Sequence, residues 1–328
     1  MLNIERVPNT AQTAHFDWGF RLTQLYGLDY RYTTSKGVLS GQLLAHNNTY
    51  GYDPANYYVD LYFPHVARGM NVRVGRYVSI PDIESQLSPS NYAYSHSLLN
   101  TYDALTQTGI LFTFKFNDHV TYQVGLNAGN DVAPWTSDAK PTLTSCLAYY
   151  WNQGLDMSYT CANSVNDGLY AYDNIQAYFT TYYHRFSNPA WHTATESYYI
   201  YQRRVPNVAG NVLNPPPTQP NAPGALCDAG QLRCYAPAWG VVNYIEHEFH
   251  NHQDAVTLRN EYYDDIRGQR TGTLSRYTED TLSFTHFIGT TATFRPEIRL
   301  DHSYDAPAYD EKTKKTQFTV AGDIIYHF

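Results

Sequence analysis

Residues 294–301 read Phe-Arg-Pro-Glu-Ile-Arg-Leu-Asp, and this stretch decides the fold. Apolar and charged side chains alternate along it without interruption. Successive side chains of a β-strand point to opposite faces of the sheet, so a period of two predicts a strand with one apolar face and one charged face. The same alternation recurs at 16–23, 57–63, 110–116, 120–127 and 317–328.

The pattern leaves open which face meets water, because a soluble barrel or sandwich would turn the apolar faces inward. Three features favour lipid outside. The expected strands often run about 10–15 residues, against about 9–11 to cross a bilayer and about 5–6 in a globular sheet. Short and long connections alternate, and aromatic residues gather near strand ends, as in outer-membrane barrels.

Composition narrows the class of protein further. The chain has 328 residues with 32 Tyr, 14 Phe and a formal net charge of −8. An acidic chain lacks the basic surface that nucleic-acid binding needs, so we expect no nucleic-acid partner. No apolar run approaches the roughly 18 residues of a membrane-spanning helix. Tyrosine suits strands and water–lipid boundaries, because its ring is apolar and its tip is polar.

We therefore predict a single all-β domain over residues 1–328, a transmembrane antiparallel up-and-down β-barrel. About 14 strands are expected, with 12–16 allowed, joined by short periplasmic turns and long outer loops partly folded into the lumen. Residues 1–14 are expected to form an N-terminal tail. The strands are expected near 15–26, 56–64, 69–79, 105–117, 119–129, 141–152, 155–163, 173–186, 190–204, 236–250, 253–264, 274–288, 290–304 and 316–328.

Two long loops, 27–55 and 80–104, are predicted to narrow the lumen, because long loops within a compact fold are usually functional. A short amphipathic helix is expected near 38–44, and another near the proline and acidic residues of 80–84. An extracellular cap is the alternative for both loops. The candidate constriction residues are Asp29, Tyr30, Arg31, Arg76, Asp82 and Glu84.

The four cysteines fall into two plausible pairs. Cys146 and Cys161 flank a tight turn at 152–154, which would place them opposite each other on neighbouring strands, within disulfide range. Cys227 and Cys234 lie in the Pro-rich loop 205–235, which they would staple. Two disulfides indicate an oxidising compartment such as the periplasm or cell surface, and four free thiols are the alternative.

The charged positions that share the inward sense of alternation predict a polar lumen. A charge facing lipid at mid-depth costs about 2–4 kcal/mol, so these residues should face water or each other. About fourteen strands leave room for a channel, and a plugged, salt-bridged interior is the alternative. The candidate pore-lining and selectivity residues are Asp17, Arg21, Asp60, Arg73, Lys115, Arg259, Glu261, Arg295, Glu297, Arg299 and Asp301.

Catalytic and metal-binding patterns are not evident. Residues 247–252 read His-Glu-Phe-His-Asn-His, but a zinc site needs three or four converging ligands, so a structural or solvated role is expected. Ser283 and His286 stand on opposite faces of one predicted strand, which separates a hydrolase pair. We expect no catalytic residue, no metal and no cofactor.

The chain ends on an alternating aromatic strand that resembles the C-terminal recognition strand of bacterial outer-membrane barrels. Tyr326 and Phe328 are the candidate assembly signal. Motifs at 25–33, 50–54, 58–62, 75–84, 94–98 and 108–109 resemble the putative β-barrel porin-2 (OmpL-like) family.

That resemblance implies a Gram-negative outer-membrane porin and supplies no catalytic residues. The start, Met1 to Glu5, lacks the features of a signal peptide, so we expect that the signal was removed or that the gene start was placed too late. The expected partners are outer-membrane lipid and lipopolysaccharide, the barrel assembly machinery and small polar solutes, with a homo-oligomer left open.

Three functions follow from these observations. The first is passive diffusion of small hydrophilic solutes or ions through a charged, loop-narrowed lumen. The second is a non-conducting structural or binding barrel whose loops recognise a surface ligand or partner. The third, an outer-membrane enzyme, lacks a catalytic constellation. A continuous polar passage would separate the first from the second.

Overall fold

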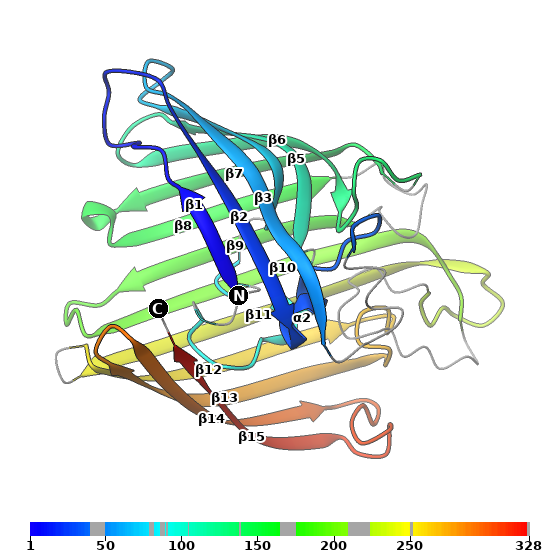
Figure 1. Ribbon diagram of the computed structural model, residues 1–328. Coiled ribbons are helices and arrows are strands. Elements are labelled where there is room, and N and C mark those ends of the chain that lie inside the picture. The colour runs from blue at the N-terminus through cyan, green and yellow to red at the C-terminus, as the bar shows by residue number, and fades with distance from the viewer. Residues whose placement is uncertain are drawn as a thin grey trace.

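The structure is a computed structural model that describes residues 1–39, 50–78, 82–85, 89, 91–103, 105–137, 139–164, 175–208, 224–249 and 252–326. Fifteen strands form one sheet in which each strand pairs with the next along the chain (Figure 1). All the pairings are antiparallel, which confirms the predicted all-β, up-and-down architecture. The sheet curls round to enclose an interior (Figure 1).

The strands follow the predicted segments closely, with one addition at the N-terminus. They are β1 Leu2–Arg6, β2 Asp17–Gly27, β3 Gly51–Phe63, β4 Met70–Val78, β5 Thr106–Lys115, β6 Val120–Asn130, β7 Thr142–Trp151, β8 Asp156–Ser164, β9 Gln176–Arg185, β10 Trp191–Pro206, β11 Arg233–Phe249, β12 Asp254–Asp265, β13 Ser275–Ile288, β14 Ala292–Ser303 and β15 Thr316–Tyr326.

Strand β1 corrects the expectation that residues 1–14 form a tail. Asn3 pairs with Thr23 of β2, and the Thr23 hydroxyl donates to the Asn3 side chain at 2.7 Å. Glu5 forms an ion pair with Arg21 at 3.1 Å. The strand is five residues long and exposed throughout, so its sequence pattern is too short to predict a strand. Within the described strands, β1 and β15 run in the same direction and are not paired with each other.

The two faces of β14 show which side of the sheet is apolar. Phe294, Ile298 and Leu300 are 42–45% exposed, while Arg295 and Glu297 are 1% and 3% exposed. A soluble protein would bury the apolar set and expose the charged set. The inverted arrangement is stable only where lipid covers the outside, because exposed apolar surface is unfavourable in water.

The helical elements with described bounds are η1 Leu28–Tyr32, α2 Leu98–Thr101 and η3 Asn152–Gly154, and the single residues Leu39 and Pro89 are also helical. Among the described residues, no helix has the length and apolar character needed to cross a membrane. The helix expected near 80–84 is wrong where it can be checked, because 83 and 84 are bends and 82 and 85 have no regular secondary structure. The described helix of this loop is α2, where the Ser97 hydroxyl accepts from the Asn100 N–H.

The first long loop is shorter than expected, because β3 begins at Gly51 and extends the pairing with β2 across a bulge near Gln24. Gly51 is required there: a Cβ would lie 2.3 Å from the Tyr30 ring. Of the helix expected near 38–44, Leu39 is helical, and residues 40–44 lie outside the described residues.

The structure places both predicted cysteine pairs in disulfides, Cys146–Cys161 and Cys227–Cys234. Cys146 and Cys161 are direct cross-strand partners on β7 and β8. Both are buried on the inward face of the sheet, where they pack with the Phe179 and Tyr198 rings. The second disulfide closes a small cluster at the end of β10 and the start of β11.

The outward apolar face predicts a depth-dependent response to charge. Ile298 lies mid-strand, so Ile298→Arg should lower the free energy of unfolding from lipid vesicles by about 2–4 kcal/mol. Phe294 lies near the strand end, and Phe294→Arg should cost about 0–1 kcal/mol. Denaturant titration of vesicle-inserted protein, followed by heat-modifiable mobility in gels, measures both. Equal losses at the two positions would contradict a lipid-facing surface.

Candidate pore and its constriction

The interior is divided by the chain between β4 and β5. We call residues 82–85 and 91–103, the parts of this loop used in the argument, the inward segment. It folds against the walls formed by β10 to β14, as its long-range hydrogen bonds show. These contacts concern residues 82–85 and 91–103 of the loop 80–104, and its narrowing of the lumen remains a prediction.

Arg259 on β12 is the central contact of the inward segment. Its guanidinium donates to the Glu84 carboxylate at 2.9 Å and to the Ser95 carbonyl oxygen at 2.6 Å. On the other side its Nε donates to Glu279 of β13 at 2.8 Å. Arg259, Glu84 and Glu279 are at most 3% exposed, so each charge depends on the others for compensation.

Further polar contacts fix the backbone of the segment. Glu261 accepts from the N–H groups of Leu98 and Leu99 at 2.7 and 2.6 Å, at the start of α2. Glu297 accepts from the Ser95 N–H at 3.0 Å, and Arg299 donates to the His96 carbonyl at 2.6 Å. Charged wall residues thus satisfy backbone groups that would otherwise be buried without partners.

Apolar packing complements these bonds. Leu99 is 1% exposed and belongs to a cluster with the rings of Tyr198, Tyr244 and Tyr263. Gly240 of β11 makes room for it, because a Cβ there would lie 2.5 Å from Leu99 Cδ1. The tyrosine content of the sequence therefore serves the interior as well as the membrane boundary, since a tyrosine ring packs while its hydroxyl bonds.

The carboxyl groups of the inward segment differ in charge state. Burial raises the pKa of Glu84, but the Arg259 guanidinium and the His96 ring outweigh burial and hold it at about 2. Burial raises the pKa of Asp82 to about 7, and the neighbouring Glu84 carboxylate adds to the rise. Glu84 is therefore a permanent anion near neutral pH, whereas Asp82 changes charge there.

The first long loop is held by Arg76 of β4, which is fully buried. Its guanidinium pairs with Asp53 at 3.0 Å and donates to Ser35 Oγ at 2.9 Å. It also donates to the Thr33 carbonyl oxygen. The Arg76 guanidinium therefore holds the loop through the backbone of Thr33 and the side chains of Ser35 and Asp53. It is fully buried and does not line the cavity beside the inward segment. The other candidates of this loop, Asp29, Tyr30 and Arg31, lie on η1, where Tyr30 is buried.

A cavity of about 740 Å³ remains between the inward segment and the opposite wall, β4 to β9. Asp82, Ile83, Glu84 and Ser85 line one side of it. The wall contributes mostly hydroxyl, amide and tyrosine side chains, and one arginine. These wall residues are Arg73, Thr113, Thr121, Gln123, Tyr150, Tyr159, Thr181 and Tyr183, and the cavity is also lined by the apolar residues Val78, Ala148, Met157 and Ala194.

Arg73 is the cation of this wall. It pairs with Asp60 of β3 at 2.9 Å, and its guanidinium lies 3.9 Å from the centroid of the Tyr58 ring. The sequence analysis did not single out Thr113, Gln123 or Tyr159 as site residues. The parity of each strand could have identified them, because they alternate with lipid-facing neighbours.

The predicted charges therefore separate into three groups. Arg73, Asp82 and Glu84 line the cavity, and Asp60 is paired with Arg73. The members of a second group contact the inward segment or pair beside it, and Arg295 among them also lines a second cavity. They are Arg259, Glu261, Arg295, Glu297, Arg299 and Asp301.

The third group lies apart from the cavity. Asp17 forms an ion pair with Arg6, and Arg21 forms one with Glu5, both beside β1. Lys115 ends β5 and pairs with Asp118 of the following turn at 3.0 Å, with both side chains more than half exposed. We expected Lys115 in the pore because it has the inward sense of alternation on β5. It stands at the end of the strand, however, and this places it at the short-turn rim of the barrel.

The assembly signal is described in part. Tyr326 ends β15 and is 67% exposed. Phe328 lies outside the described residues, so its role remains a prediction.

An up-and-down sheet with a lipid-compatible outer face and a polar, narrowed interior defines the class of outer-membrane channels. The chain belongs to the family described as putative beta-barrel porin-2, OmpL-like, whose model matches residues 2–328. A comparison with curated proteins gave no match.

Solved outer membrane proteins, a porin among them, share the fold at low sequence identity. The anion-selective porin from Comamonas acidovorans has a TM-score of 0.54 and 11% identity, over 94% of this chain and 81% of that one. The outer membrane channel DcaP of Acinetobacter baumannii has a TM-score of 0.55 and 10% identity, over 95% and 80%. The trimer form of OmpT from Vibrio cholerae has a TM-score of 0.53 and 8% identity, over 99% and 96%.

The contacts of Glu84 predict that low pH destabilises the folded position of the inward segment. The pKa of Glu84 is lowered from 4.5 to about 2, so its stabilising effect is full above pH 4.5 and is lost as pH falls toward 2. Amide hydrogen exchange of residues 91–103, corrected for intrinsic rates, should rise over that range. Glu84→Gln should show the faster exchange already at neutral pH. Glu5→Gln, which removes an exposed carboxylate, is the matched control, and similar exchange in the two variants would contradict the assignment.

Proposed function

We propose that the protein is a porin through which small hydrophilic solutes or ions diffuse passively between the inward segment and the β4–β9 wall. The single observation that carries the proposal is the 740 Å³ cavity beside a firmly anchored segment. The segment bonds to the wall formed by β10 to β14, and this supports a lumen that is narrowed without being filled. Family membership and the shared fold agree with a channel rather than an enzyme.

The lining favours polar and weakly charged solutes. Hydroxyl and amide groups replace part of a solute's hydration, and tyrosine rings offer flat contact surfaces. Arg73 stands opposite Asp82 and Glu84 across the cavity, so both signs of charge line it. Mixed signs create a transverse field that orients dipolar solutes.

The alternative is a non-conducting binding barrel. The dense charge network around Arg259 favours it, because such contacts could close the interior on that side. Single-channel recording of refolded protein in a planar bilayer separates the two functions. Stable conductance steps support the porin, whereas silence from protein shown to be inserted supports the binding barrel.

The expected partners are part of this proposal. Porin family membership indicates a bacterial outer-membrane location, where lipid and lipopolysaccharide surround a barrel and the assembly machinery inserts it. OmpT, the similar outer membrane protein from Vibrio cholerae, is described in a trimer form, which supports testing this chain for a homo-oligomer. Cross-linking in detergent would report that state.

Selectivity should depend on the charges of the cavity. Arg73→Gln removes the cation from the wall, so the reversal potential in a salt gradient should move toward cation preference. Lys115→Gln removes the same charge at the exposed rim and should move it far less. Equal shifts in the two variants would show that the cavity is not the conducting path.

Asp82 should make selectivity depend on pH. Its pKa of about 7 leaves it neutral at low pH and charged at high pH. Asp82→Asn should therefore reduce cation preference about two units above that pKa and leave it unchanged about two units below. Reversal potentials at both pH values measure this, and an identical effect at the two would contradict the assignment.

A further inference from the structure

A second cavity, of about 670 Å³, lies at the short-turn end of the barrel. Glu246 and Glu248 of β11 open onto it, together with His252 of the turn after β11 and Tyr92 of the inward segment. Its rim includes Gly289 and Thr290, which form another short turn. The cavity therefore gives a mobile ion or small solute a route to the two glutamates.

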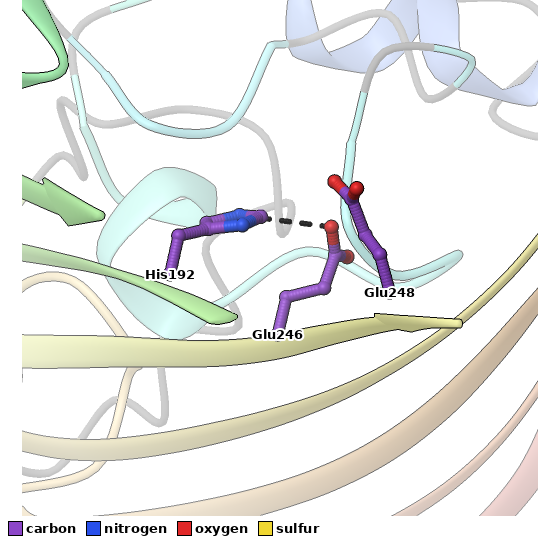
Figure 2. Close-up of side chains that lie close together, drawn as sticks. All are labelled: His192, Glu246 and Glu248. Carbon is purple, nitrogen blue, oxygen red and sulfur yellow. Dashed lines mark ion pairs between the residues drawn. The ribbon is translucent and has the colours of Figure 1, made fainter. Parts of the chain in front are cut away.

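Strand pairing brings a histidine to the same place. His192 of β10 is the direct cross-strand partner of Glu246, and Glu248 follows two residues along on the same face. Figure 2 shows the His192 ring directed at the Glu246 carboxylate, with Glu248 beside it. One nitrogen of His192 and one carboxylate oxygen of each glutamate lie within 4.8 Å of one another.

The separation of these atoms suits a metal ion. His192 Nε2 lies 3.6 Å from Glu246 Oε1, which is longer than a normal hydrogen bond. Zinc ligands lie about 2.0–2.2 Å from the ion, so two ligands in a tetrahedral site are about 3.3–3.6 Å apart. The atoms thus already stand at a ligand-to-ligand distance, and small side-chain rotations would bring Glu248 to the same point.

The environment of His192 favours coordination. The residue is 4% exposed, and Nε2 is the ring nitrogen that faces Glu246. Its Nδ1 has no hydrogen-bond partner among the described residues, so no contact fixes the ring from that side. The Tyr92 hydroxyl lies 3.1 Å from Nε2 and would turn aside to let an ion in. Thr257 donates to the second oxygen of Glu246 at 2.6 Å, which leaves Oε1 directed toward the histidine. Such outer contacts are how proteins orient metal ligands.

The two glutamate charges also favour a bound cation. Two glutamates share one face of β11, and no lysine or arginine ion pair to either is recorded in the described part of the chain. Arg185 is the other cross-strand neighbour of His192, and its side chain donates to the Tyr183 hydroxyl. Its charge also acts on Glu246 and Glu248, and Arg295 lines the same cavity, so a bound ion would compete with these two cations. His252 contacts Glu248 from the turn and is mostly exposed, so it could join as a fourth ligand.

We propose that His192, Glu246 and Glu248 form a binding site for a divalent transition-metal ion such as Zn²⁺ at the short-turn mouth of the barrel. One imidazole and two carboxylates, with an open position facing the cavity, match the ligand types that Zn²⁺ accepts. Calcium and magnesium fit less well, because they prefer oxygen ligands only. Sequence analysis expected no metal here, because residues 247–252 offer too few ligands without His192 from another strand.

The test uses refolded full-length protein in detergent, stripped with a chelating resin and titrated with Zn²⁺ against a chromophoric chelator. We expect one ion per chain, and at least about tenfold weaker binding in His192→Ala and in Glu248→Gln. His184→Ala is the matched control, because His184 pairs with Asp156 at the same end without a third ligand. Tyr92→Phe should bind at least as well as the natural chain.

Heat-modifiable mobility identifies variants that fail to fold. X-ray absorption of the zinc-loaded natural chain then supplies a readout that needs no variant, and one imidazole with oxygen ligands is expected. Absence of binding, binding that His192→Ala and Glu248→Gln leave unchanged, or a spectrum without imidazole would each overturn the proposal. None of these readouts requires conduction, so the site and the porin function fail separately.

Discussion

The guanidinium of Arg259 is the contact on which the interior depends. It joins two strands of the wall and the inward segment in a single buried network through Glu84, Glu279 and the Ser95 carbonyl. A buried charge is unfavourable unless it is paired and hydrogen-bonded, so the segment has a strong preference for this one position. In that position the segment lies beside a cavity that is lined on its other side by β4 to β9.

The other constraint is the bilayer. Backbone N–H and C=O groups within lipid need hydrogen-bond partners, and in an up-and-down sheet each strand supplies them to its neighbours. The outer face then takes the apolar residues, as the exposed Ile298 and Leu300 show. Polar residues are left for the interior, where tyrosine packs and bonds at once. The same inversion that makes the chain compatible with lipid therefore supplies the polar lining of a channel.

Much of the fold could be predicted from sequence because alternation is a local property. Strand positions and the Cys146–Cys161 register follow from the period of two and from one tight turn. β1 could not be predicted, because five exposed residues carry too little pattern. Lys115 shows a second limit: alternation gives the side of the sheet but not the depth along the strand, and depth separates a pore residue from a rim residue.

The sequence by itself determined the class of fold, the outward and inward faces and the family. Only the tertiary structure decided which inward charges meet the cavity and which are covered. Glu84 and Arg259 are 175 positions apart, and no local pattern relates them. His192 and Glu246 become neighbours only because β10 and β11 pair in one register. The physical reason is that side-chain direction depends on the local backbone, whereas contact partners depend on strand register and on where a loop returns.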